Sequence, residues 1–145
     1  MNASLKIMLF VICLFTFNTI GNASSYVVEE SFVELISTGN SIRLKHFFNS
    51  RLQVSIGNNG KIVSAQQAYM MLDDFFSNNP PQKFRMTLNG GKDENRYLSG
   101  ILVTSNGIFN LSIYYTLIGE NKKEIIQQIR IKKYEGQLRL SESAD

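Results

Sequence analysis

The chain has 145 residues, and 15 lysines and arginines against 12 aspartates and glutamates give it a net charge of only +3. This length predicts one domain with a hydrophobic core of its own. The near balance of charge argues against a nucleic-acid-binding protein. The single cysteine, Cys13, excludes a disulfide framework and a cysteine metal site.

The first 23 residues have the pattern of a secretory signal peptide. Lys6 precedes an apolar run from Ile7 to Phe17, which is too short to span a bilayer, and small residues follow. We expect cleavage between Ala23 and Ser24, export to the periplasm or out of the cell, and membrane contact only through the uncleaved peptide. A lipid anchor on Cys13 or a retained membrane anchor are weaker alternatives.

Two helices are predicted at the start of the remaining chain. Apolar residues recur at helical spacing from Val28 to Ile36, and Gly39 offers a left-handed stop. Ser41 is the expected cap of a second, shorter helix. The buried stripe of that helix is expected to contain Leu44, Phe47 and Phe48.

A short strand pair and a third helix come next. Apolar and polar residues alternate over Arg51–Ile56, Gly57–Gly60 must turn, and Lys61–Val63 can pair back. Ser64–Gln67 has the sequence of a capping box, which opens a helix that Pro80 and Pro81 end. The predicted buried face of this helix consists of Ala65, Ala68, Leu72, Phe75 and Phe76.

The chain after Pro81 reads as four strands. The alternation is clearest at Lys83–Leu88 and Phe109–Leu117, and Asn106-Gly107 is a strong hairpin turn. The element order α-α-β-β-α-β-β-β-β predicts an α+β fold. We expect a cone-shaped roll in which three N-terminal helices pack on a curved antiparallel sheet. The domain is expected over residues 24–135, followed by a polar tail at 136–145.

Three segments give the chain a resemblance to a known family. They are Phe75–Pro81 with its aromatic pair and double proline, Gly100–Thr104 running into Asn106–Phe109, and the closing strand Ile125–Ile131. Together with the element order, they resemble the nuclear-transport-factor-2-like (cystatin-like) superfamily. Within it, the chain looks closest to a family of small exported Bacteroidetes proteins of uncharacterised function. The resemblance implies a cone that can enclose a pocket and frequent pairing through sheets, but it supplies no catalytic residues.

Four side chains are the candidates for a pocket in such a cone. Tyr69 and Tyr115 could donate hydrogen bonds, and His46 and Asp73 could move a proton. For each residue a structural role is the favoured interpretation: an exposed histidine, a solvated carboxylate and core tyrosines. No partner stands at a spacing that would define a catalytic pair, and neither a metal site nor a cofactor is expected.

The polar positions of the last two strands should share one face of the sheet. This face mixes tyrosine, arginine and small polar residues, as moderately polar protein interfaces do. It is the candidate homodimer face, although a merely solvated face is an equal alternative. Its expected members are Asn110, Ser112, Tyr114, Thr116, Gln128 and Arg130.

These observations favour an exported, non-catalytic binding or interaction module. Its expected partner is a second copy, another protein or a small apolar ligand, and not a nucleic acid. The alternative is a small isomerase-, dehydratase- or hydrolase-like enzyme that uses a pocket in the cone. That alternative requires at least two ionisable side chains converging on one cavity.

Overall fold

The computed structural model describes residues 31–136. The predicted signal peptide at 1–23, its cleavage between Ala23 and Ser24, the start of the first helix, and residues 137–145 of the polar tail lie outside this range. Residues 31–37 are helical. The elements that follow are α3 (Ser41–Lys45), β1 (Phe48–Ile56), β2 (Asn59–Ser64), α4 (Ala65–Asn78), β3 (Pro81–Lys92), β4 (Asn95–Thr104), β5 (Gly107–Ile118) and β6 (Lys123–Lys133).

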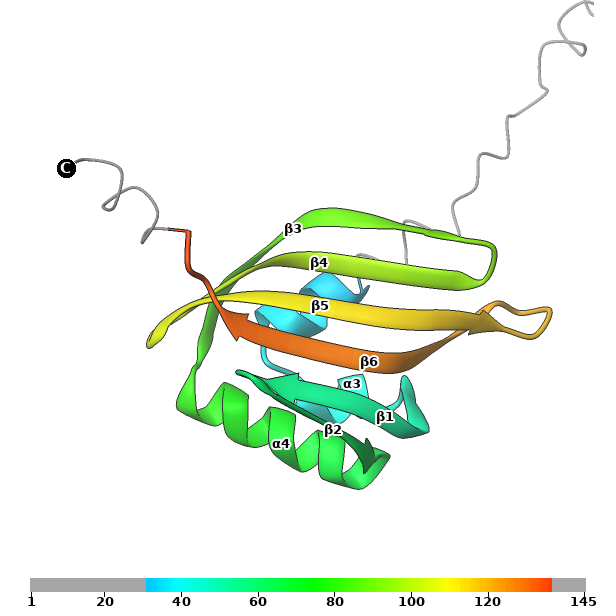
Figure 1. The fold of residues 1–145 in the computed structure, drawn as a ribbon, viewed down its shortest axis with the longest axis horizontal. Helices are drawn as coiled ribbons and strands as arrows, with labels where there is room; N and C mark the ends of the chain where they lie inside the picture. The colour runs from blue at the N-terminus through cyan, green and yellow to red at the C-terminus, as the bar shows by residue number, and fades with distance from the viewer. Residues whose placement is uncertain (1–30, 137–145) are drawn as a thin grey trace, which may run out of the picture.

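The six strands form one curved sheet in the order β2-β1-β6-β5-β4-β3, so the expected element order and α+β class are confirmed (Figure 1). The expectation of an antiparallel sheet needs one correction, because β1 and β6 run parallel, with Val54 beside Ile129. All other neighbours are antiparallel. The alternation of a strand defines its two faces but not its neighbour, so the sequence did not reveal this pair.

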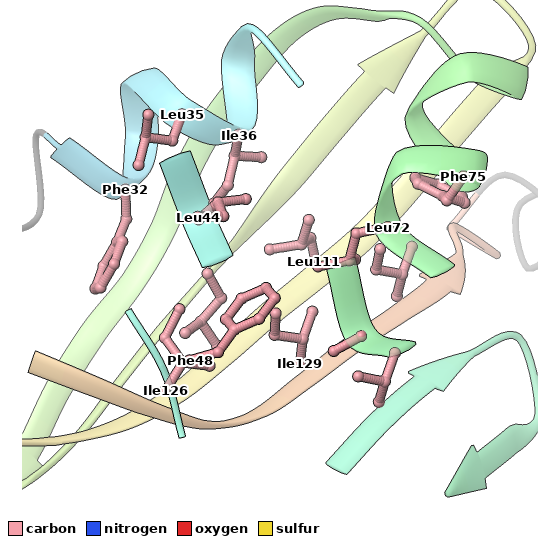
Figure 2. Packing of buried hydrophobic residues seen from close by; sticks show 14 of the residues in the cluster. Phe32, Leu35, Ile36, Leu44, Phe48, Leu72, Phe75, Leu111, Ile126 and Ile129 are labelled. Atoms are coloured by element: carbon pink, nitrogen blue, oxygen red, sulfur yellow. The ribbon is translucent and has the colours of Figure 1, made fainter. Parts of the chain in front are cut away.

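A single hydrophobic core lies between the helices and the inner face of the sheet (Figure 2). Figure 2 shows side chains from residues 31–37 and α3 meeting those of β1, β5 and β6, with α4 closing one side. Phe32, Ile126 and Leu98 are fully buried at 0% exposure. Apolar side chains therefore occupy the space between the layers, where the resemblance allowed for a pocket.

Helix α4 follows the prediction closely. The Ser64 hydroxyl oxygen accepts a hydrogen bond from the Gln67 backbone N–H at 3.2 Å, and the Gln67 side chain accepts one from the Ser64 N–H at 3.1 Å, so the capping box is formed. Ala68, Leu72 and the Phe75-Phe76 pair are buried, and Ala65 packs partly buried against the core. The cap and the apolar face thus agree on where the helix starts and which side it buries.

Helix α3 is shorter than expected and has a different cap. Asn40 is the N-cap, because its side chain accepts a hydrogen bond from the Arg43 N–H. The helix ends at Lys45, so Phe47 and Phe48 are not helical. The Phe47 carbonyl accepts a hydrogen bond from the Ile126 N–H, which draws this stretch into the sheet. Leu44 and Phe48 are nevertheless buried, as expected.

Strands β3 and β4 approach each other closely around a glycine. Gly100 pairs with Met86, and the ring of Phe84 covers the space where a side chain at residue 100 would stand. A Cβ atom placed there would lie 2.5 Å from the Arg85 carbonyl oxygen and 2.5 Å from Phe84 Cζ. Glycine is therefore required here by close packing, and an aromatic ring shields the exposed backbone.

Candidate functional site

His46 and Asp73, the candidates for moving a proton, come from different elements, and the hollow that Asp73 lines does not include His46. His46 is exposed at the C-terminal end of α3, where its backbone N–H caps the helix. Asp73 is exposed on α4, and its Oδ1 accepts a hydrogen bond of 2.6 Å from the Ser41 hydroxyl. This hydrogen bond links α3 to α4, so Asp73 has a structural role.

The two tyrosine candidates pack against the core from different elements. Tyr69 is half-buried on α4, with the Lys45 ammonium 5.4 Å from its ring centroid. Tyr115 is 6% exposed on β5, and its ring meets Phe32 edge to face at 5.3 Å. Tyr115 is thus a core residue, and Tyr69 packs partly buried against the core.

Asp73 lines a surface hollow outlined by described residues. That hollow has a volume of about 270 Å³, and its walls include Gly39, Phe76 and Pro81. It holds no second ionisable side chain. This hollow therefore does not bring together the acid and base that an enzyme of the alternative kind requires.

The outward-facing side of the sheet, here called the outer face, carries the six residues expected for the dimer face. In β5 they alternate with buried Leu111, Ile113 and Tyr115, and in β6 they flank buried Ile129. In Figure 1 the helical segment 31–37 lies behind β4 and β5, and no described helix crosses in front of β3 to β6. The outer-face members so placed are Asn110, Ser112, Tyr114, Thr116, Gln128 and Arg130.

Strand pairing adds β4 to this face, which sequence analysis did not foresee. Ser99 donates a hydrogen bond of 2.7 Å to Ser112, its cross-strand partner. Tyr97 pairs with Tyr114, and their ring centroids are 6.4 Å apart. Only the register shows that Tyr97 stands beside Tyr114 on the outer face.

Gln127 is a further outer-face residue that the sequence did not reveal. The β5–β6 register shifts between Tyr114 and Tyr115, so Gln127 lies at a β-bulge. Its side-chain amide donates to Thr116 Oγ1 at 3.0 Å and accepts from the Asn49 amide at 2.8 Å. The three side chains tie β1, β6 and β5 together. A bulge has no reliable sequence signature, because it interrupts the alternation that would identify it.

Other kinds of site find little support in the part of the chain that the structure describes. Within residues 31–136, His, Asp and Glu side chains nowhere gather in a group of three that could hold a metal ion. None of the helices in this range combines the length and the apolar character needed to cross a membrane.

The curved sheet wrapped around its helices places the chain in the nuclear-transport-factor-2-like fold class. A protein of unknown function from Silicibacter pomeroyi with this fold aligns with a TM-score of 0.55 at 12% identity, over 77% of this chain and 94% of that one. At this identity the likeness shows the fold alone.

A match to a family model identifies the family more narrowly. Residues 30–132 match "Domain of unknown function (DUF4783)", and the chain belongs to this family. A family member from Bacteroides fragilis aligns at 31% identity with a TM-score of 0.66, over 71% of this chain and 95% of that one. One from Bacteroides uniformis aligns at 29% with a TM-score of 0.68, over 73% and 96%. A comparison with curated proteins found no match.

Proposed function

We propose that this protein is an exported, non-catalytic binding module that uses the outer face of its sheet. One observation carries the proposal: a broad sheet face, on which Tyr114 is 42% exposed, stands uncovered by any described element. The apolar core fills the other side of the sheet. We therefore assign partner binding to the outer face of the sheet.

The composition of the outer face supports this proposal. Tyrosine and arginine are enriched at protein interfaces and carry much of their binding energy. Here Tyr97, Tyr114 and Arg130 project among small polar side chains such as Ser99 and Ser112. The occupant is either a second copy, as the sequence analysis expects, or another macromolecule.

Site-specific photo-crosslinking in the producing cell tests the proposal. A benzophenone amino acid replaces Tyr114 in one variant and Met70, a 59% exposed residue on α4, in the matched control. We expect a discrete cross-linked product from position 114 only, and mass spectrometry then identifies its second component. Equal products from both positions, or none from position 114, would contradict the proposal. N-terminal sequencing of exported material tests cleavage between Ala23 and Ser24.

A further inference from the structure

The six strands of the sheet contain almost no negative charge. Their sole carboxylate is Glu124, which pairs with Leu117, a partly buried residue packed on the core side. The remaining carboxylates of the described range lie on helices, in turns or after β6. The outward positions of the strands therefore hold cations without a single counter-charge: Arg51, Lys83, Arg85, Lys92, Lys123, Arg130 and Lys132.

Four of these cations form two separate rows. Lys83 and Arg85 lie on β3, and Arg130 and Lys132 lie on β6. All four are exposed, and the one ion pair recorded among residues 31–136 joins Arg43 to Glu34 elsewhere. Their positive charge is thus available to a partner.

The strip between the rows is neutral. Every outward position of β4 and β5 is uncharged. Its apolar side chains gather toward the two ends: Ile101, Val103 and the 38% exposed Ile108 at one, and the Tyr97–Tyr114 pair at the other. Between them stand the small polar side chains of Ser99, Ser112 and Asn110. Three strand spacings separate β3 from β6, so the strip is about 14 Å wide. An α-helix with its side chains is about 10–12 Å across, which fits this width.

We infer that the outer face binds an amphipathic α-helix of a partner protein, with an apolar stripe against β4 and β5 and acidic residues against the cations of β3 and β6. This inference rests on the proposed function and specifies its partner. Opposite charge at the rim of an apolar contact steers binding and fixes the orientation of the partner. A uniformly charged polyanion would leave the neutral strip unused.

The same charge pattern works against a second copy on this face. Two copies related by a twofold axis place the same patch on both sides of the contact. Arg85, Arg130 and their neighbours would then be buried against a surface that offers no carboxylate. Like charges brought together in this way cost several kcal/mol, and an unpaired buried charge adds a desolvation penalty.

Designed peptides provide a defined test. The probe is a fluorescein-labelled helix of about 20 residues, which is roughly as long as β4 is extended, with leucines along one stripe and glutamates on both flanks. A second peptide carries lysines in place of the glutamates. Fluorescence anisotropy measures binding to the wild type, to Arg85→Glu/Arg130→Glu, and to the charge-matched control Lys61→Glu/Lys122→Glu. Both control positions are exposed and lie off the outer face.

We expect the glutamate peptide to bind the wild type at least about tenfold more tightly than the lysine peptide. The affinity of the glutamate peptide should fall as the salt concentration is raised from about 50 to about 500 mM. The Arg85→Glu/Arg130→Glu variant should bind it at least about tenfold less tightly, while the control stays within about twofold. On the same variant the lysine peptide should become the better ligand.

Several outcomes would overturn the inference. These are equal binding of both peptides, equal effects of the two double variants, or binding of poly-L-glutamate as tight as that of the glutamate peptide. The inference would also be overturned if an oligonucleotide or phosphatidylglycerol vesicles bound more tightly than the glutamate peptide. If no acidic peptide binds but position 114 cross-links to a second copy, the inference fails and the proposed function stands. If position 114 gives no product either, both fail.

Discussion

Replacing Gly100 with alanine should lower the stability of the domain. The new Cβ atom would lie 2.5 Å from the Arg85 carbonyl oxygen and 2.5 Å from Phe84 Cζ, well inside normal contact. The carbonyl belongs to the paired strand β3 and cannot move without disturbing the ladder. Overpacking of this kind typically costs about 1–3 kcal/mol. Restricting the unfolded chain returns about 0.4–1 kcal/mol, so we expect a net loss of roughly 1–2 kcal/mol.

The matched control is Gly60→Ala, because Gly60 also lies in a strand. A Cβ at Gly60 meets Gln53 and Ser55 at 3.4 Å or more, which is ordinary contact. Urea unfolding followed by circular dichroism measures both variants, since the chain has no tryptophan. The Gly100 variant should also melt several degrees lower. Equal stability of the two variants would refute the steric argument.

Three further substitutions test the helices. Ser64→Ala removes the capping box of α4 and should cost about 1 kcal/mol in urea unfolding; an unchanged midpoint would mean that the cap contributes nothing. Leu72→Ala opens a cavity under α4, where Leu72 is 1% exposed, and should cost about 2–5 kcal/mol; a loss below about 1 kcal/mol would show that the core closes over the gap. Ser41→Ala removes the hydrogen bond to Asp73 and should cost about 0.5–1.5 kcal/mol, while Ser41→Thr retains a hydroxyl and should lose less if that bond is the cause.

The sequence predicted best those elements whose local signals agree with one another. In α4 the capping box, the apolar face and the double proline all indicate the same boundaries, and the helix follows them. In α3 the spacing of Leu44, Phe47 and Phe48 fits a helix equally well, yet the last two lie outside it. A short apolar run fits both the helical period and the strand period. Only pairing with β6, which is distant in the sequence, determines which of the two structures forms.

The same distinction holds for the candidate site: local patterns predicted its residues, but contacts between distant segments could not be predicted. Alternation alone placed Asn110, Ser112 and Tyr114 on the outer face, because a period of two leaves a strand residue only two sides. It could not show that Ser112 meets Ser99, since register depends on partner strands. The contact of Asp73 with Ser41 was equally hidden, because two helices separated by a strand pair have no sequence pattern that aligns them.

Strand β6 connects the two parts of the sheet, since it pairs with β1 on one side and with β5 on the other. Without it, the chain contains two separate pieces: a hairpin of β1 and β2 with α4, and a meander of β3, β4 and β5. Each piece would present an unpaired edge. Pairing β1 with β6 brings together segments that lie far apart in the sequence, and closing such a long loop slows folding. The domain therefore cannot exist as one cooperative unit before β6 has been synthesised.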